Sequence, residues 1–428
     1  MSESDPRQKP PCYREDALSV LKRLRDSGHV AYFAGGCVRD SLLGLEAKDW
    51  DVATDAPPDR VRQLFKLSQA VGAAFGVILV KSGRSQVEVA TFRSDGVYED
   101  GRHPSSVRFT SSEEDARRRD FTINGLFLDP IEDRVIDFVG GRDDLTAKIL
   151  RAIGSPAERF AEDHLRLLRA VRFAGRFGFE IEPVTREAIV ALAPRIKSIS
   201  PERIADELRW MLTATTRNIA WTLLWELGLG REIFRFLPKP PERLDAQRSI
   251  FLNVDVEHSI SFGLALAAAT LDARGQPDIL PLLTRDEISR SAAAMVQALR
   301  ISNREYDEMS ETLAGIEPLL QVNPPTLAQK KRFLARQTSP QSRSLMDAMA
   351  RVGIHSTRIE TLRTDWSALS AEDVSPSPLL SGDDLIALGI KPGPQFRQIL
   401  DGVYDAQLEN KIASRDQAIE LAITLRTA

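Results

Sequence analysis

Hydrophobic and polar residues alternate in two different ways along the chain. Up to about residue 138, short apolar runs of strand length are separated by turns that contain glycine or proline. Beyond about residue 145 these runs fade, and apolar residues recur at the three- and four-residue spacing of amphipathic helices. The pattern therefore predicts an N-terminal α+β domain followed by an all-α remainder.

The same pattern locates individual elements. Strands are expected where apolar residues run for four to eight positions, and helices where they recur on one face. The expected elements are a helix at 14–27, a strand at 29–34, a short helix at 38–43, a hairpin of strands at 75–81 and 86–92, a last strand at 135–138, and one long helix at 158–178 closed by glycine.

The segment 33–51 combines glycines with carboxylates. Gly35 and Gly36 stand between the first strand and the short helix, where backbone N–H groups can approach a phosphate closely. Asp49 and Asp51 follow on a second extended run, so alternation places both carboxylates on one face of a strand. That geometry suits a divalent metal ion, although each motif by itself is usually only a turn or a strand end.

Glu88 lies on the second strand of the expected hairpin, and its side chain is expected on the opposite face from those of Val87 and Val89. If that strand lies beside the one that carries Asp49 and Asp51, Glu88 completes a site of three carboxylates. The hairpin alone is equally consistent with Glu88 on the solvent side of an edge strand.

Composition and charge limit the possible classes of protein. The 428 residues are enough for roughly two to four domains. No apolar run approaches a membrane span and the N-terminus lacks a signal-peptide core, which predicts a cytoplasmic protein without a membrane partner. Cys12 and Cys37 are too few for a disulfide framework or a cysteine zinc site. The net charge of −4 means that any RNA contact must come from local basic patches.

The order of these motifs resembles a known family. The stretches G-G-C-V-R-D-S-L-L-G and K-D-W-D-V-A-T-D-A resemble the signature of the class II tRNA nucleotidyltransferases, the CCA-adding enzymes, and of their bacterial poly(A) polymerase relatives. The resemblance implies a mixed sheet in the head and two Mg²⁺ ions held by Asp49 and Asp51. At E-V-A-T-F-R it favours Glu88 as the third carboxylate, with Asp120 as the alternative.

Further motifs in the sequence resemble those with which the family binds the nucleotide. The segment R-R-D-F-T-I-N resembles the motif that holds ribose and triphosphate, and D-G-R-H-P within 94–106 resembles a flexible loop of the CCA-adding enzymes. The loop is expected to contribute Asp100 and Arg102. The nucleotide-binding residues that the resemblance implies in the head are Gly35, Gly36, Arg39, Arg119, Asp120 and Asn124.

Asp163 and Arg166 are candidates for recognition of the base. Their spacing predicts neighbours on one helix face, which by itself favours an ordinary salt bridge. Cytosine and adenine, however, present an amino donor beside a ring-nitrogen acceptor, which a carboxylate beside a guanidinium complements. The motif E-D-x-x-R, matched by Glu162, Asp163 and Arg166, is understood in the family as such a template.

Basic residues beyond this motif leave two interpretations open. Arg169 and Arg172 continue along the same helix with Arg176, as a surface stripe or as a track for nucleotide or RNA phosphates. A second basic cluster at 330–336 is expected to bind RNA in the same way. The five histidines are too few for the metal phosphohydrolase domain of some relatives.

Together these features predict a template-independent nucleotidyltransferase that adds C and A to the 3′ end of tRNA from CTP and ATP. The alternatives are a poly(A) polymerase, a partial CC- or A-adding enzyme, or a non-catalytic RNA-binding relative; the sequence gives no oligomeric state. The expected domains are a lead-in and helix at 1–27, a catalytic head at 28–145, a helical neck with base recognition at 146–230, a helical body at 231–370 and an RNA-binding helical tail at 371–428.

Overall fold

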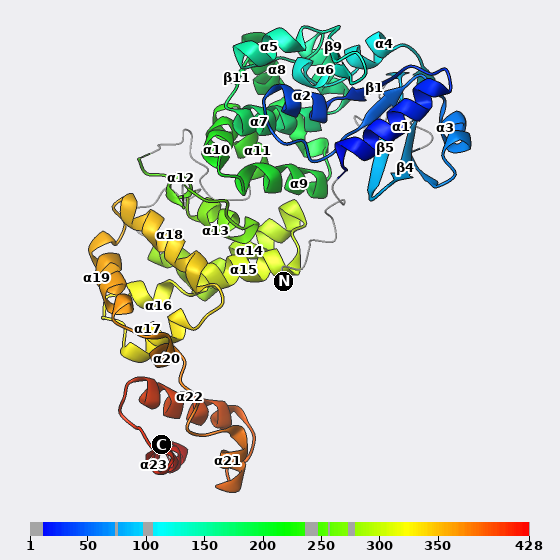
Figure 1. Ribbon diagram of the computed structural model, residues 1–428. Helices are drawn as coiled ribbons and strands as arrows, with labels where there is room; N and C mark the ends of the chain where they lie inside the picture. The colour runs from blue at the N-terminus through cyan, green and yellow to red at the C-terminus, as the bar shows by residue number, and fades with distance from the viewer. Residues whose placement is uncertain are drawn as a thin grey trace. The chain divides into compact units, whose positions relative to one another are not determined.

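The computed structural model describes residues 12–72, 76–96, 106–235, 247–255, 257–272 and 279–427. The chain forms two compact units (Figure 1). Of the described residues, those within 12–211 and 219–233 belong to unit 1, and those within 212–218 and from 234 onward belong to unit 2. None of the helices in these ranges is both long and apolar enough to cross a membrane.

Unit 1 is built on a sheet of seven strands. Strand β2 runs parallel to β5, and the other neighbouring pairs are antiparallel, which confirms the mixed sheet. The strands, in their order across the sheet, are β3 (Ser68–Gly72), β4 (Val77–Ser82), β5 (Ser85–Thr91), β2 (Val52–Thr54), β1 (Ala31–Ala34), β8 (Phe127–Asp129) and β9 (Arg134–Ile136).

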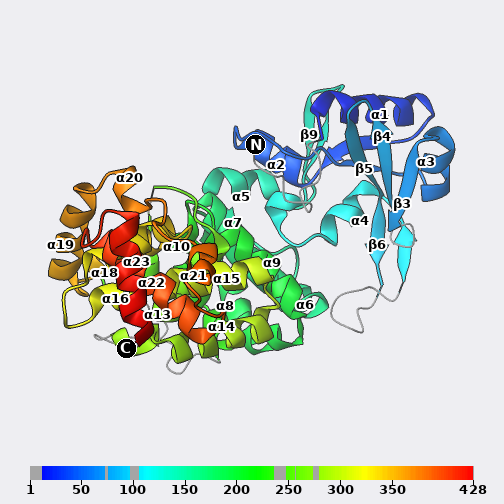
Figure 2. The same ribbon diagram turned by 90° about the horizontal axis from the view of Figure 1, so that it is seen from below.

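Helix α1 (Arg14–Asp26) covers one face of β1, β4 and β5 (Figure 1, Figure 2). Its buried residues, which include Val20 and Leu24, form the predicted apolar stripe. The predicted hairpin β4–β5 is also confirmed, with a tight turn at Gly83. Gly83 has φ +53°, and a Cβ there would lie 2.2 Å from Asp16 Oδ1, so both the backbone and the neighbouring helix require glycine.

The rest of unit 1 is mainly helical. One small parallel pair, β10 (Ile149–Leu150) with β11 (Glu180–Ile181), was not predicted, because strands of two residues leave no periodic pattern. The remaining elements are α2 (Gly36–Leu42), α3 (Pro58–Leu64), β6 (Arg93–Asp95), β7 (Val107–Phe109), α4 (Ser112–Arg117), η2 (Thr122–Asn124), α5 (Gly141–Ala147), α6 (Pro156–Glu162), α7 (Leu165–Phe177), α8 (Pro183–Leu192), η3 (Ala193–Ser198), α9 (Pro201–Leu212), α10 (Arg217–Glu226) and α11 (Leu229–Ile233).

The described part of unit 2 consists of helices. Helix α13 is buried along its whole length, and the last three helices enclose a separate apolar cluster around Leu385 and Ile399. The helices are α12 (Ile250–Asn253), α13 (Phe262–Asp272), η4 (Leu280–Leu283), α14 (Arg285–Leu299), α15 (Asn303–Ala314), α16 (Glu317–Leu320), α17 (Leu327–Leu334), α18 (Ser339–Arg351), α19 (Ser356–Ser367), α20 (Ala371–Val374), α21 (Gly382–Ala387), α22 (Pro394–Leu408) and α23 (Arg415–Thr427).

Residues of the basic cluster at 330–336 form ion pairs with acids of the same unit, and its predicted RNA binding stays a prediction. Lys331 is buried, with 3% of its surface exposed. Lys330 pairs with Asp365 at 2.7 Å, and Arg332 pairs with Asp405 at 2.5 Å. Lys330 and Arg332 therefore join α17 to α19 and α22, and their charges are compensated within unit 2.

Candidate active site

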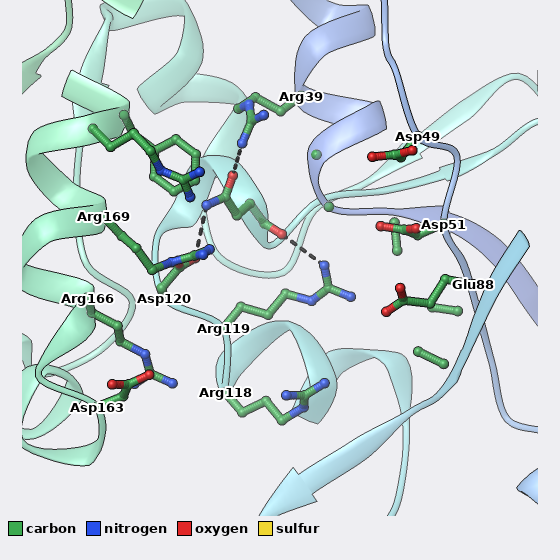
Figure 3. Close-up of a pocket in the computed structure, with 18 of the residues that line it drawn as sticks. Arg39, Asp49, Asp51, Glu88, Arg118, Arg119, Asp120, Asp163, Arg166 and Arg169 are labelled. Carbon is green, nitrogen blue, oxygen red and sulfur yellow. Dashed lines mark hydrogen bonds and ion pairs between the residues drawn. The ribbon is translucent and has the colours of Figure 1, made fainter. Parts of the chain in front are cut away.

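The described part of unit 1 contains an open pocket of about 700 Å³ (Figure 3). Figure 3 shows a row of carboxylates on one side and the arginines of α7 on the other. The charged residues that line it are the acids Asp49, Asp51, Glu88, Asp120 and Asp163, and the arginines Arg39, Arg118, Arg119, Arg166, Arg169, Arg172, Arg176 and Arg203. Because arginines are in excess, the pocket suits an anionic ligand.

Gly35 and Gly36 form the turn between β1 and α2, which confirms the predicted order of strand, glycine pair and helix. Gly35 has φ +72°, a conformation that favours glycine. A Cβ at this position would lie 2.9 Å from Nη1 of Arg119. Glycine therefore lets the backbone of the turn and the Arg119 guanidinium approach each other at the pocket wall.

Asp49 and Asp51 lie in the segment that leads into β2, just before the strand itself. The predicted alternation holds, because the residue between the two carboxylates, Trp50, and the residue after them, Val52, are both buried. The Trp50 ring packs against Phe33 with 4.9 Å between centroids. The aspartates face the pocket (Figure 3), whereas Trp50, the middle residue of the D-x-D motif, packs in the core.

Glu88 lies beside these aspartates. Strand β5 runs parallel to β2 with Val52 opposite Val89. Asp51 and Glu88 come directly before these two residues and therefore lie next to each other across the strands. Strand β5 lies between β4 and β2, and the interpretation of Glu88 as the solvent side of an edge strand is therefore wrong. Figure 3 shows Asp49, Asp51 and Glu88 in one row.

In the described ranges, no three His, Cys, Asp or Glu side chains are placed so that they could hold a metal ion by themselves. This arrangement still fits Mg²⁺, which is usually held by one or two carboxylates and completed by water and substrate phosphates. Asp49, Asp51 and Glu88 supply the oxygen ligands that such an ion prefers.

Asp120 accepts hydrogen bonds from three neighbours. Its Oδ1 accepts hydrogen bonds from the Phe121 N–H at 2.8 Å and from Asn124 Nδ2 at 2.9 Å, and its Oδ2 accepts one from Arg169 Nε at 2.8 Å. Burial opposes ionisation of Asp120, but the Arg169 charge and the Asn124 hydrogen bond outweigh it and lower the pKa of the carboxyl. These bonds disfavour the alternative in which Asp120 is the third metal carboxylate.

Arg39 was predicted to bind the nucleotide, and its side chain is 5% exposed. Nε of Arg39 donates to Asp40 Oδ1 at 2.8 Å, and Nη1 donates to Asn124 Oδ1. Arg39 therefore lines the pocket and also binds the amide oxygen of Asn124, a second lining residue.

Arg118 and Arg119 are held by one buried carboxylate. Nη2 of Arg118 lies 2.7 Å from Asp115 Oδ1, and Nη2 of Arg119 lies 2.9 Å from Asp115 Oδ2. Burial of Asp115 opposes its ionisation, but the two guanidinium groups lower its pKa overall. Arg117, the first of the three successive arginines, is exposed on α4 and pairs with Glu113.

Replacement of Asp115 by alanine should destabilise the chain by about 3 kcal/mol, because two partly buried arginines lose their anion. The lowered pKa means that the carboxylate stabilises the fold above its unfolded pKa of about 3.9, and that this contribution disappears as the pH falls through the folded pKa. Urea denaturation at several pH values checks both effects. An unchanged midpoint at pH 7 would contradict the structural function of Asp115.

Asp100 and Arg102, which were predicted to lie in a flexible loop, are outside the described residues. The segments on either side of it pair as the two-stranded sheet β6–β7. The predicted contributions of Asp100 and Arg102 remain predictions.

The prediction of one long helix over 158–178 is wrong. Helices α6 and α7 are separated at Asp163, whose backbone is extended with φ −144° and ψ 105°. Asp163 Oδ1 accepts a hydrogen bond from the Leu165 N–H at 3.0 Å, so the carboxylate takes the place of a helical partner. Gly178 ends α7 with φ +65°, as predicted.

Asp163 and Arg166 nevertheless lie next to each other at the pocket (Figure 3). Asp163 Oδ2 pairs with Arg203 of α9 at 2.8 Å, whereas Arg166 pairs with Glu162 at the end of α6. Each residue thus forms its ion pair with another partner, which differs from the simple helix salt bridge that the spacing suggested.

Three further arginines of α7 belong to the pocket wall, so the predicted basic ridge is not a separate surface stripe. Arg169 and Arg172 lie over the Phe173 ring, and Arg176 lies over the Phe177 ring, at 4.7–5.3 Å from the centroids. The acidic partners of Arg169, Arg172 and Arg176 are Asp120, Glu207 and Asp40.

Several supporting residues were not identified from the sequence. Three are acids that form ion pairs with the pocket arginines, and one is an arginine that pairs with Asp163. A buried acid on an otherwise amphipathic helix is the one local signal that could have indicated them, and Glu207 on α9 is an example. The residues missed are Asp40, Asp115, Arg203 and Glu207.

Comparison with known families gives two matches. Residues 31–151 match the family described as "Poly A polymerase head domain", and residues 178–239 match "Probable RNA and SrmB- binding site of polymerase A". The first match covers the seven-stranded sheet from β1 onward and most of the pocket.

Whole-chain comparisons extend the similarity. The CCA-adding enzyme of Streptococcus suis (strain 05ZYH33) is 31% identical over 414 residues, which are 95% of each chain. That of Geobacillus kaustophilus (strain HTA426) is 32% identical over 419 residues, which are 96% of each chain. The crystal structure of the Bacillus stearothermophilus CCA-adding enzyme in complex with CTP is similar with a TM-score of 0.73 at 27% identity, and the match covers 98% of this chain and 99% of that one.

Proposed function

We propose that this pocket is the active site for the addition of C and A to the 3′ end of tRNA. The chain belongs to the family of the CCA-adding enzymes. The chain is a tRNA nucleotidyltransferase by its similarity to these enzymes over nearly its whole length. The observation that supports the location is the pocket itself, in which a row of carboxylates faces Asp163 and Arg166 across a set of arginines.

Divalent metal ions are used by nucleotidyltransferases of this family. We propose Mg²⁺, with Asp49 and Asp51 as ligands and Glu88 beside them. The chemistry that such ions supply is activation of the RNA 3′-hydroxyl and neutralisation of charge on the departing pyrophosphate. Strands β2 and β5 are hydrogen-bonded neighbours, so the sheet fixes the positions of these carboxylate oxygens relative to one another.

The triphosphate and ribose belong between the carboxylates and α7. Arg119 lies against the glycine turn, and its planar donor fork suits a phosphate group. Asp120 and Asn124 supply the acceptor and the donor that a ribose hydroxyl requires. Arg169 and Arg172 add positive charge on the far wall.

Asp163 and Arg166 recognise the base in this proposal. The carboxylate accepts from the exocyclic amino group of C or A, and the guanidinium donates to the adjacent ring nitrogen. Guanine and uracil offer an oxygen and an N–H at the same positions, so both contacts become mismatched. Arg203 and Glu162 hold the two side chains ready before the nucleotide enters.

The helical parts of the chain then bind the RNA. We propose the neck at 146–230, the body at 231–370 and the tail at 371–428 as the tRNA-binding regions, with CTP and ATP as the nucleotides and the cytoplasm as the location. The match of residues 178–239 to a probable RNA-binding family supports the neck, and the CTP bound to the Bacillus stearothermophilus relative supports one of the nucleotides.

A primer-extension assay tests this function. The protein is incubated with tRNA that ends before, within or after C-C-A, and with each nucleotide alone or in pairs. We expect two C residues from CTP alone, one further A when ATP is added, and no use of GTP or UTP. Long A tails, or A addition without prior C, would contradict the proposal and would instead support a poly(A) polymerase or an A-adding enzyme.

A further inference from the structure

We propose that Arg39 is a positioning residue that sets the preference for ribose over deoxyribose, because it fixes the Asn124 amide and, through it, the Asp120 carboxylate. The inference rests on the proposed function, since it requires a nucleotide sugar beside Asp120 and Asn124. Its starting point is that the Arg39 guanidinium is held by Asn124 and Asp40 at the wall of the pocket that Asn124 and Asp120 also line.

The position of the Arg39 guanidinium is fixed on several sides. Its Cζ atom lies 5.0 Å from the centroid of Phe173 and 4.8 Å from that of Phe177, both on α7. Asp40 neutralises its charge and is in turn held by Arg176 at 2.9 Å. The side chain therefore has little freedom, and it ties α2 to α7 behind the pocket.

Arg39 determines which way the Asn124 amide faces. A guanidinium has donors and no acceptors, so it can bond only the amide oxygen. Nη1 of Arg39 bonds Asn124 Oδ1, and the amide NH₂ consequently faces Asp120, to which it donates at 2.9 Å. With the amide reversed, Oδ1 would face the Asp120 carboxylate, and Nδ2 would face a guanidinium that cannot accept.

This orientation matches a hydroxyl group. One N–H of the Asn124 amide bonds Asp120, and no partner for the second N–H is found within the described ranges. A hydroxyl accepts one hydrogen bond and donates another, so the second N–H and the Asp120 carboxylate can satisfy the 2′-hydroxyl of a ribose together. A 2′-deoxyribose would leave both groups without that ligand.

Two substitutions test the inference in the full-length protein. Arg39→Lys keeps the charge but lacks the planar fork that reaches Asp40 and Asn124 together, and Arg39→Met removes every donor. The measurement is kcat/KM for CTP and for 2′-deoxy-CTP with tRNA that lacks C-C-A. We expect the ratio of CTP to 2′-deoxy-CTP to fall about tenfold in both variants, mainly through CTP, because one hydrogen bond to a charged group is lost.

Arg176→Met is the matched control. Arg176 also pairs with Asp40 and lies over Phe177, but its hydrogen bond is to Asp40 and not to Asn124. The control should keep the parent ratio, and thermal unfolding of all variants separates changes in the ratio from loss of folded protein. If Arg39→Met does not fold, Arg39→Lys decides.

The outcomes are distinguishable. An unchanged ratio in the Arg39 variants, with a lowered ratio in Asn124→Ala, would overturn the positioning function of Arg39 and leave the proposed active site intact. An unchanged ratio in Asn124→Ala as well would also remove the ribose from this part of the pocket. A fall of the ratio in Arg176→Met equal to that in Arg39→Lys would show a general packing effect and would likewise overturn the inference.

Discussion

Replacement of Asp49 or Asp51 by alanine should abolish nucleotide incorporation while the protein stays folded. The expected loss in kcat is at least about a thousandfold, because a metal site contributes several kcal/mol of charge stabilisation in the transition state. The fold should tolerate the change, since Asp49 is exposed and removal of one of several neighbouring carboxylates relieves repulsion. Single-turnover incorporation of CTP at saturating Mg²⁺ is the measurement.

Glu46→Ala provides a matched control, because Glu46 is an exposed acid of the same connecting segment and does not line the pocket. It should retain parental activity. The aspartate variants should still bind CTP in equilibrium measurements without metal, since Asp163, Arg166 and Arg169 lie on the opposite side of the pocket. Near-parental turnover in either aspartate variant would remove the metal site from this part of the sheet.

Replacement of Arg166 or Asp163 by alanine should reduce discrimination among the four nucleotides. Arg166→Ala leaves the ring nitrogen of C or A without a donor, and Asp163→Ala leaves the amino group without an acceptor. A hydrogen bond to a charged group contributes about 1.5–3 kcal/mol, so the preference for CTP and ATP should fall roughly ten- to a hundredfold. The measurement is kcat/KM for CTP, ATP, GTP and UTP.

The structure makes this prediction sharper than the sequence did. Arg166 Nη1 is occupied by Glu162 and by the Arg159 carbonyl, so under the proposed function the remaining guanidinium nitrogens are the donors left for the base. Arg186→Ala is a suitable control, because Arg186 also pairs with an acid, Glu226, outside the pocket. If the Asp163 and Arg166 variants lost activity equally for all four nucleotides, the two residues would be structural and the base would be recognised elsewhere.

Short-range features of the site were predictable from the sequence. The glycine turn, the D-x-D alternation and the β4–β5 hairpin each depend on the conformational preferences and side-chain directions of neighbouring residues. The resemblance to the family, which is carried by the same motifs, added the functional meaning of Asp163 and Arg166. Local periodicity failed at Asp163 itself, because an aspartate that bonds the backbone two residues later can interrupt a helix without a glycine or a proline.

The tertiary structure alone decided which partner each charged residue has. Arg176 meets Asp40 across 136 positions of the chain, and Arg169 meets Asp120 across 49, and no local period encodes such contacts. The fold also places Arg39, which was predicted to bind the nucleotide, against Asn124, 85 positions away. Other long-range ion pairs join Lys330 to Asp365 and Arg332 to Asp405. A sequence specifies the charges, but the fold determines whether a charge is compensated by the protein or remains for a ligand.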